Sequence, residues 1–283
     1  MAAIGFIAHS QREGAVNLAQ QTAQWLRDQG HVAEFLDAAS STGVGRDGSD
    51  RKPFDLAVSL GGDGTMLRTV DLVSPDGVPV LGVNLGHLGY LTAVEPESLR
   101  DALRRFLDGD YQVESRMTLD VSVTNDGGDG AHTVLHRSAL NDLVLQRPAG
   151  GHTVRTEVAV NGEPFLSFAA DSLIVATPTG STAYNLSARG PIVSPRARVS
   201  ILTPVAPHML FDRSLVLDAD ERISLSPIAG QPADMVVDGW LAATLHPGQT
   251  LHCRKGDRDA LLVTFGARDF HEILKRKFNL ADR

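Results

Sequence analysis

The spacing of apolar residues changes once along the chain and divides it into two parts. Up to about residue 108, apolar runs of strand length alternate with segments whose apolar residues recur every three or four positions, as on one face of a helix. The order is strand, helix, strand, strand, helix, strand, helix, which predicts an α/β domain with an open, mostly parallel sheet. The expected strands are residues 4–8, 32–36, 55–60 and 78–83, and the expected helices are residues 13–29, the segment around Met66, Leu67 and Val70, and the segment from Pro96 to Leu107.

From Tyr111 onward, apolar residues occur in short runs rich in Val, Leu and Thr, separated by turn sequences such as Asn161-Gly162. The runs lie at residues 117–124, 131–136, 141–145, 154–160 and 165–168, and the same rhythm returns from about 198 to 265. This pattern predicts a mostly β domain of two packed sheets. Residues 268–280 have helical spacing again, and we expect this C-terminal helix to pack back on the first domain. The predicted domains are residues 1–110, with 266–283 returning to them, and residues 111–265.

Composition narrows the class of protein. With 283 residues, of which 42% are hydrophobic and 21% charged, the chain is typical of soluble globular proteins. It has no apolar run near the ~20 residues that span a bilayer, and its apolar start lacks the basic region of a signal peptide. The single Cys253 excludes an internal disulfide and argues against a metal site built from cysteines, so we expect a cytoplasmic protein. A formal charge of -8 gives no support for a nucleic-acid or membrane partner.

A glycine-rich turn lies between the expected strand at residues 55–60 and an expected helix. Its sequence is Gly61-Gly62-Asp63-Gly64-Thr65. Glycines let the backbone approach a ligand closely, and the N–H groups of a helix start favour an anion, typically a phosphate. Because a carboxylate repels phosphate, Asp63 suits a site that needs a base beside phosphate better than a simple phosphate cradle. An ordinary tight turn with a surface Asp would explain the same residues.

Three other stretches contain glycine-rich or hydroxyl-rich sequence. A second glycine loop covers residues 84–92, after the strand at 78–83. Residues 177–182, Thr-Pro-Thr-Gly-Ser-Thr, follow a strand and precede a helix that opens at Ala183, which suits an anion, a sugar hydroxyl or an ordinary helix cap. Residues 43–48 match the G-x-G-x-x-G pattern of dinucleotide-binding turns. They lie in a polar loop at residues 39–52 without the strand and helix that the pattern needs, so we assign them no function.

Taken together, these motifs resemble the NAD kinases in sequence and in their order along the chain. The resemblance rests on residues 61–65, 84–92, 141–142 and 177–184, and it extends to Pro191–Pro195 and Leu202–His208. It covers nearly the whole chain, from Ile4 to the terminal helix. Lipid kinases and phosphofructokinases have a turn similar to the first motif, so the stretch at 177–187 is the one that singles out NAD kinase.

The resemblance implies transfer of phosphate from ATP to the 2′-hydroxyl of the adenosine ribose of NAD, giving NADP. In the family the residue matching Asp63 is the catalytic base, and Gly64 and Arg68 would lie along the phosphates. The residues implied in binding the dinucleotide are Asn141, Asp142, Asp171, Thr182, Ala183, Tyr184, Asn185, Leu186 and Ser187, with His152 as a further candidate by position. The chemistry also implies Mg2+ held mainly through the ATP phosphates, without a dedicated metal site in the protein. Family members generally assemble as dimers or tetramers, so we expect a homo-oligomer whose pockets can be completed across subunits.

Four positions depart from the usual family sequence. Asp142 stands where Glu is usual, Ser172 and Arg189 stand where glycines are common, and Trp240 stands where Gln is usual. Three of these positions lie in or beside the dinucleotide-binding stretches. They leave open whether NAD or NADH is the preferred substrate.

Two other functions fit part of the sequence. A kinase for a lipid or sugar hydroxyl would use the turn at Gly61 but would leave the motif at residues 177–187 without a purpose. A non-catalytic NAD(P) sensor would use both motifs for binding, but it would gain little from the carboxylate of Asp63 beside phosphates. Both remain alternatives at the level of the sequence.

Overall fold

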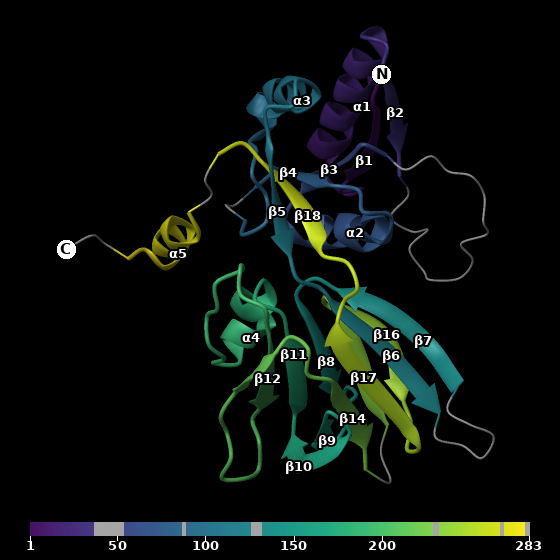
Figure 1. Ribbon diagram of the computed structural model, residues 1–283, viewed down its shortest axis with the longest axis vertical. Helices are drawn as coiled ribbons and strands as arrows, with labels where there is room; N and C mark the ends of the chain where they lie inside the picture. Colours follow the sequence, from purple (N-terminus) through teal and green to yellow (C-terminus); the bar gives the residue numbers. More distant parts are fainter. Residues whose placement is uncertain (37–53, 87–88, 126–131, 229–231, 267–268, 281–283) are drawn as a thin grey trace. The chain divides into compact units, whose positions relative to one another are not determined.

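The computed structural model describes residues 1–36, 54–86, 89–125, 132–228, 232–266 and 269–280. The chain forms two compact units, which Figure 1 shows as ribbons. The first unit comprises Met1–Arg116 and Arg258–Arg283, and the second comprises Met117–Asp257. The loop expected at residues 39–52, with its G-x-G-x-x-G sequence, and residues 87–88 of the second glycine loop lie outside the described residues.

The first unit is built on a six-stranded sheet, sheet A. In sheet order its strands are β2 (Val32–Phe35), β1 (Ala3–Ala8), β3 (Leu56–Gly61), β4 (Val80–Asn84), β18 (Ala260–Thr264) and β5 (Gln112–Arg116). Neighbouring strands are parallel except β18 and β5, which pair antiparallel at one edge. The predicted α/β domain with an open, mostly parallel sheet is confirmed.

Helices cover both faces of sheet A. They are α1 (Glu13–Asp28), α2 (Asp63–Val73) and α3 (Leu99–Leu107), with the short 3-10 helices η2 (Ser74–Asp76) and η3 (Pro96–Ser98). Ala19 of α1 and Leu103 of α3 share one apolar core with Val83 of β4. The preceding residue of β4, Gly82, faces the other side of the sheet and packs against Met66 of α2. Both glycine loops therefore start at the carboxyl ends of adjacent strands, β3 and β4, where open α/β sheets bind ligands.

The second unit is a sandwich of two six-stranded antiparallel sheets. Sheet B has the order β10 (Glu163–Ala170), β9 (Val154–Val160), β14 (Ile223–Pro227), β17 (Gln249–Lys255), β6 (Leu119–Asn125) and β7 (His132–Ala139). Sheet C has the order β13 (Leu215–Asp218), β12 (Val199–Val205), β11 (Ser172–Ala176), β8 (Asp142–Gln146), β15 (Ala233–Val237) and β16 (Trp240–Leu245). The predicted β domain of two packed sheets is confirmed.

The inner faces of sheets B and C share one apolar core. Val121 of β6 is buried in this core, so the alternation of side chains along a strand places Asp120 and Ser122 on the outer face of sheet B. The outer face of sheet C is covered, because Ile174 of β11 belongs to a second buried cluster against which Val193 packs.

Two strands join a different sheet from the one that their place in the sequence indicates. β5 and β18 fall within the stretch 111–265 that the sequence pattern groups with the β domain. In the structure they form one edge of sheet A, where Leu262 of β18 pairs with Val80 of β4. Periodicity identifies a segment as a strand but does not identify its partner, which depends on long-range pairing.

The remaining helices of the described residues lie in both units. In the second unit, η4 (Gly180–Thr182) is followed by the one-turn helix α4 (Tyr184–Ser187), which ends just before Arg189 at φ 63°. In the first unit, α5 (Phe270–Phe278) places the Lys277 ammonium 4.6 Å from the centre of the Tyr90 ring, so the C-terminal helix contacts the second glycine loop. No described helix is long and apolar enough to cross a membrane.

Candidate active site

The first glycine turn joins β3 to α2, with Gly62 as the residue that precedes the helix. Gly61 is buried, and a Cβ at this position would lie 2.2 Å from the Thr65 hydroxyl oxygen and 2.7 Å from the Thr65 Cβ. No larger residue fits there. The turn therefore keeps the start of α2, with its exposed N–H groups, close against the end of the strand.

Asp63 connects the two glycine loops. Its carboxylate accepts the backbone N–H of Tyr90 at 3.0 Å and that of Leu91 at 3.1 Å. A Cβ on Gly89 would lie 2.3 Å from the Asp63 Oδ1, so only glycine allows the second loop to approach this closely. The carboxylate is thereby fixed in direction while one lone pair on each oxygen remains for another partner.

Gly64, Arg68 and Lys277 lie around the same helix start. Gly64 is exposed, and no heavy atom lies within 4 Å of the position where its Cβ would be. Arg68 follows four residues later and shares its face of α2. Lys277 adds a second cation through its contact with the Tyr90 ring. Sequence reasoning missed Lys277; its only signal was the basic run Lys-Arg-Lys at residues 275–277.

In the second unit, two segments singled out by the sequence lie against each other. The Thr177 hydroxyl donates to the Leu140 carbonyl at 2.6 Å, and the Thr177 N–H donates to the Asn141 carbonyl at 2.8 Å. A Cβ on Gly180 would lie 2.0 Å from that same Asn141 oxygen. The turn at residues 140–142 and the turn at residues 177–180 are therefore hydrogen-bonded and closely packed against each other.

Asp142 is a buried acid at this junction, with 4% of its surface exposed. Burial, together with the nearby Asp238 carboxylate, raises the pKa of Asp142 to about 7, although the Tyr184 N–H that it accepts acts in the opposite direction. Near neutral pH a large fraction of the molecules therefore carries a protonated Asp142, which can donate a hydrogen bond as well as accept one.

Asp238 holds the turn that contains Asn141 and Asp142. Its carboxylate accepts the N–H groups of Leu140 at 2.8 Å, Asn141 at 2.7 Å and Asp142 at 3.1 Å. Asp238 and Gly239, at φ 48° and 84°, make the hairpin turn between β15 and β16. Sequence reasoning did not assign Asp238 to the site, because an Asp-Gly pair between two strands is already explained as a hairpin turn.

The stretch Thr182–Ser187 contains both interior and exposed side chains. Asn185 is fully buried: its amide nitrogen donates to the Pro191 carbonyl at 3.0 Å, and its amide oxygen accepts the Thr203 hydroxyl at 2.7 Å. Tyr184 is 41% exposed and Ser187 is exposed. Asn185 therefore has a structural role in this segment, whereas a ligand can reach the exposed side chains of Tyr184 and Ser187.

Asp171 and His152 are not brought together with Asp142. Asp171 precedes β11, whose far end, Ala176, pairs with Asp142; a strand of this length spans roughly 17 Å. Asp171 forms an ion pair with Arg147 at 3.2 Å, and Arg147 donates to the Gly151 carbonyl at 2.9 Å, next to the exposed His152. Asp171 and His152 thus form a separate polar group at the opposite end of sheet C.

The buried carboxyl of Asp142 makes stability depend on pH. Its folded-state pKa of about 7 lies above the ordinary value of 3.8, so the folded protein binds more protons between these values. The free energy of unfolding therefore falls as pH rises from about 4 to about 7. Asp142→Asn removes this titration, and its stability relative to wild type should rise by on the order of 2 kcal/mol between about pH 5 and pH 8.

Urea unfolding at both pH values measures this difference, with Asp212→Asn, whose side chain is 58% exposed, as the control. A stability difference between Asp142→Asn and wild type that is the same at both pH values would show that Asp142 titrates normally.

Removal of the Asp238 carboxylate should loosen the turn at residues 140–142. Asp238→Ala leaves three N–H groups without their acceptor, and we expect a loss of on the order of 3 kcal/mol in the free energy of unfolding. Asp238→Asn, which keeps one acceptor oxygen, should lose less.

Denaturant unfolding checks this expectation against Asp234→Ala on the preceding strand, β15, whose carboxylate accepts the Thr244 hydroxyl at 2.8 Å in an exposed pair. That control should cost less than about 1 kcal/mol. Equal losses in Asp238→Ala and Asp234→Ala would contradict the assigned role.

Comparison with known proteins matches both units. The ATP-NAD kinase N-terminal domain family matches residues 42–111, and the ATP-NAD kinase C-terminal domain family matches residues 140–265. A protein of Heliobacterium modesticaldum named NAD kinase is 38% identical over 287 residues, which cover 98% of each chain. NAD kinase 1 of Streptomyces coelicolor is 35% identical over 313 residues, covering 99% of this chain and 86% of the relative.

Two solved structures have the same fold. A yeast NADH kinase complexed with NADH superposes with a TM-score of 0.82 at 22% identity, covering 100% of this chain and 89% of the other. An NAD kinase from Archaeoglobus fulgidus in complex with ATP gives a TM-score of 0.69 at 25% identity, covering 99% and 96%. The family matches in both units, together with full-length relatives at 35% and 38% identity, show that the chain belongs to the NAD kinase family of phosphotransferases.

Proposed function

We propose that the chain transfers the terminal phosphate of ATP to the 2′-hydroxyl of the adenosine ribose of NAD, with Asp63 as general base. The observation that carries this proposal is the fixed carboxylate of Asp63 at the start of α2, with both oxygens held by backbone N–H groups. Phosphoryl transfer depends on positioning, on neutralisation of charge and on an acceptor for the hydroxyl proton. A carboxylate whose direction is set by the backbone supplies the acceptor without the cost of orienting a mobile side chain.

Gly64, Arg68 and Lys277 are proposed to handle the phosphates. The N–H groups at the start of α2 can donate to phosphate oxygens, and the absence of a side chain at Gly64 lets a phosphate approach the backbone. Arg68 and Lys277 supply positive charge on the same side. The Archaeoglobus relative was solved with ATP, which supports ATP as the donor here.

The reaction is proposed to use Mg2+ that is held mainly by the ATP phosphates. In the described residues, no three His, Cys, Asp or Glu side chains gather into a group that could hold a metal ion. Phosphate oxygens of ATP and water would supply the Mg2+ ligands, which leaves the Asp63 carboxylate available as the base. When bound, Mg2+ neutralises charge on the transferring phosphate.

The dinucleotide is proposed to bind the second unit at the joined turns. Asn141 and the protonated Asp142 offer hydrogen bonds to ribose or amide groups, and the exposed Tyr184 ring offers a face for stacking. The same segment also contributes Thr182, Ala183, Leu186 and Ser187. The buried Asn185 side chain holds the segment in this conformation. Asp238 acts on the dinucleotide only through the turn that it supports.

We also propose a cytoplasmic homo-oligomer. Asp171 and His152 lie at the far end of sheet C from Asp142, so one subunit does not bring them to the same ligand atoms. A second copy of the chain that presents its Asp171 and His152 at this site would complete the pocket. Light scattering together with the activity of mixed Asp171→Ala and Asp142→Ala subunits tests this assembly.

The first test of the function is NADP formation by the purified protein with ATP and magnesium, with NAD and NADH offered separately. Rapid NADP formation from NAD supports the proposal. Phosphorylation of NADH alone would make NADH the substrate and would indicate Arg189 and Trp240 as residues that determine this preference. Binding of NAD without product would favour a sensor, and absence of both would favour a kinase for a lipid or sugar hydroxyl.

Asp63→Asn should abolish most turnover while keeping affinity for NAD. The amide has nearly the same shape but cannot accept the proton, so we expect kcat to fall by roughly 100- to 10,000-fold. Steady-state kinetics and NAD titration measure the two effects, and Asp71→Asn on the same helix controls for the loss of a charge. If Asp63→Asn keeps wild-type kcat, Asp63 is not the base.

Gly64→Ala should raise the stability of the protein and lower its activity. No heavy atom lies within 4 Å of the new Cβ, so the alanine should stabilise α2 by about 0.5 kcal/mol. The same methyl group would occupy the proposed phosphate path, so kcat/KM for ATP should fall by about tenfold or more.

Thermal unfolding and kinetics on the same sample test both halves of the Gly64→Ala prediction. Gly61→Ala is the contrast, because its Cβ would lie 2.2 Å from the Thr65 hydroxyl oxygen and should lower stability directly. Unchanged kcat/KM in Gly64→Ala would show that no phosphate passes close to this backbone.

A further inference from the structure

The outer face of sheet B has small polar side chains at its centre. Ser224 of β14, His252 of β17 and Ser122 of β6 lie directly opposite one another across three neighbouring strands, and His136 of β7 continues the row. The larger β-branched and aromatic residues, which are enriched in strands, would cover more of a sheet face than serine does. The small side chains leave this part of the face uncovered.

A cleft of about 680 Å3 lies over this row, entirely within the second unit. Its principal side chains are Asp120, Ser122, Arg222, Ser224, His252 and Arg254. The Asn161-Gly162 turn between β9 and β10 also lines it. The cleft is on sheet B, whereas the turn at residues 140–142 and the segment at residues 177–187 adjoin sheet C. It is therefore a separate candidate site.

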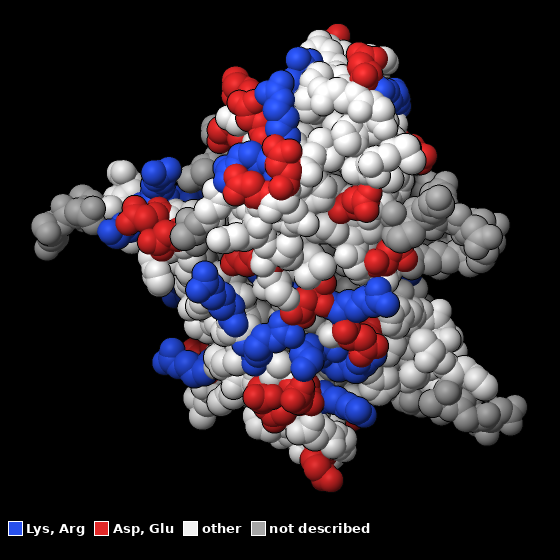
Figure 2. Space-filling view, turned by 45° about the horizontal axis from the view of Figure 1, so that its top comes forward, with Lys and Arg blue, Asp and Glu red and all other residues white. Residues whose placement is uncertain are grey.

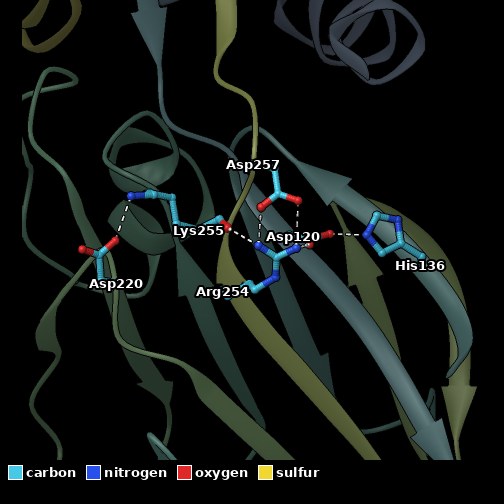
Figure 3. Close-up of polar contacts among 6 residues, drawn as sticks. All are labelled: Asp120, His136, Asp220, Arg254, Lys255 and Asp257. Carbon is cyan, nitrogen blue, oxygen red and sulfur yellow. Dashed lines mark hydrogen bonds and ion pairs between the residues drawn. The ribbon is translucent and has the colours of Figure 1, made fainter. Parts of the chain in front are cut away.

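Most charges around the cleft are compensated. On the face drawn in Figure 2, Lys and Arg lie interspersed with Asp and Glu. Figure 3 shows that the Asp120 carboxylate contacts both Arg254 and His136, and that Arg254 also binds Asp257 at 2.5 Å and 3.1 Å. Because Arg254 is held between two carboxylates, its guanidinium is fixed at one wall of the cleft and is not available to a ligand.

Arg222 is the exception. Its side chain is exposed, and it forms no ion pair with any residue in the described part of the chain. Its backbone is fixed at the rim: the Arg222 N–H donates to the Asn161 side chain at 2.9 Å, and the Asn161 N–H donates to the Arg222 carbonyl at 2.8 Å. Of the two arginines that line the cleft, Arg222 is therefore the one whose guanidinium is available to an anion, and its backbone is fixed.

The floor of the cleft suits a hydroxylated ligand. The two ring nitrogens of His252 lie 3.0 Å from the Thr124 hydroxyl and 3.0 Å from the Ser224 hydroxyl, so the imidazole is held in one orientation. Ser122 adds a hydroxyl beside it. Because both ring nitrogens of His252 are engaged by these hydroxyls, the groups left for a ligand are the Ser122 and Ser224 hydroxyls, which can donate to and accept from sugar hydroxyls. The volume is in the range of pockets that hold small molecules.

We propose that this cleft on the outer face of sheet B binds a phosphorylated sugar, with Arg222 on the phosphate and the Ser122 and Ser224 hydroxyls facing the sugar hydroxyls. The Arg222 guanidinium can donate charge-assisted hydrogen bonds to a phosphate monoester, and such bonds are stronger than those between neutral groups. Binding here would give the protein a second ligand, recognised without any residue assigned above to phosphate transfer. The proposal is independent of the reaction that the chain catalyses.

Isothermal titration of the full chain with ribose 5-phosphate tests the site, with ribose and inorganic phosphate as separate probes. We expect saturable binding of ribose 5-phosphate, weaker binding of inorganic phosphate and none of ribose. Arg222→Met should weaken ribose 5-phosphate binding by about tenfold or more, since it removes hydrogen bonds to a charged group. Ser122→Ile should also weaken ribose 5-phosphate binding, because the larger side chain fills part of the cleft.

The matched control is Arg155→Met, an exposed arginine on β9 of the same sheet that does not line the cleft. Its ribose 5-phosphate affinity and that of wild type should agree, and NADP formation by Arg222→Met should equal that of wild type. No saturable binding up to about 10 mM, or equal affinity in Arg222→Met and wild type, would overturn the site. Equal affinity for inorganic phosphate and ribose 5-phosphate would overturn recognition of the sugar. A protein that binds the sugar phosphate but makes no NADP would overturn the proposed function alone.

Discussion

A carboxylate that accepts several backbone N–H groups holds the glycine-rich segments of each unit. Asp63 accepts the N–H groups of Tyr90 and Leu91 in the first unit, and Asp238 accepts those of residues 140–142 in the second. Such turns have few side chains to pack, so hydrogen bonds to a fixed acceptor determine their shape. The acceptor in turn is fixed because it sits at the end of a helix or strand that the sheet holds.

The carboxylates of Asp63 and Asp238 differ in the role that each has besides holding a turn or loop. Asp63 is half-buried at a helix start, so it can both hold a loop and meet a substrate hydroxyl. Asp238 is used in holding the turn, and its charge helps to raise the pKa of the buried Asp142 beside it. One residue type thus serves as proposed base, as loop support and as a neutral hydrogen-bonding group, and the surroundings decide which.

The glycines of the motifs are present for two physical reasons. At Gly61, Gly89 and Gly180 a Cβ would collide with a neighbouring group, so these positions are required by packing alone. At Gly64 the space is open, and the fold by itself would accept alanine. Gly62 also has open space, so Gly62 and Gly64 are the motif glycines to associate with a ligand. The same reasoning applies to the small residues on the outer face of sheet B.

The sequence by itself determined the class of each unit, the order of nearly all strands and helices, and the family. These follow from local periods and from motifs such as Gly61–Thr65 and residues 177–184, whose meaning lies in consecutive residues. The sequence could not decide that β5 and β18 complete sheet A, because strand partners are set by long-range pairing. Nor could it show that Asn185 faces inward, that Asp238 supports residues 140–142, or that Arg222 lacks an ion pair among the described residues. Burial, convergence and charge compensation are properties of residues far apart in the chain, and only the tertiary structure brings those residues together.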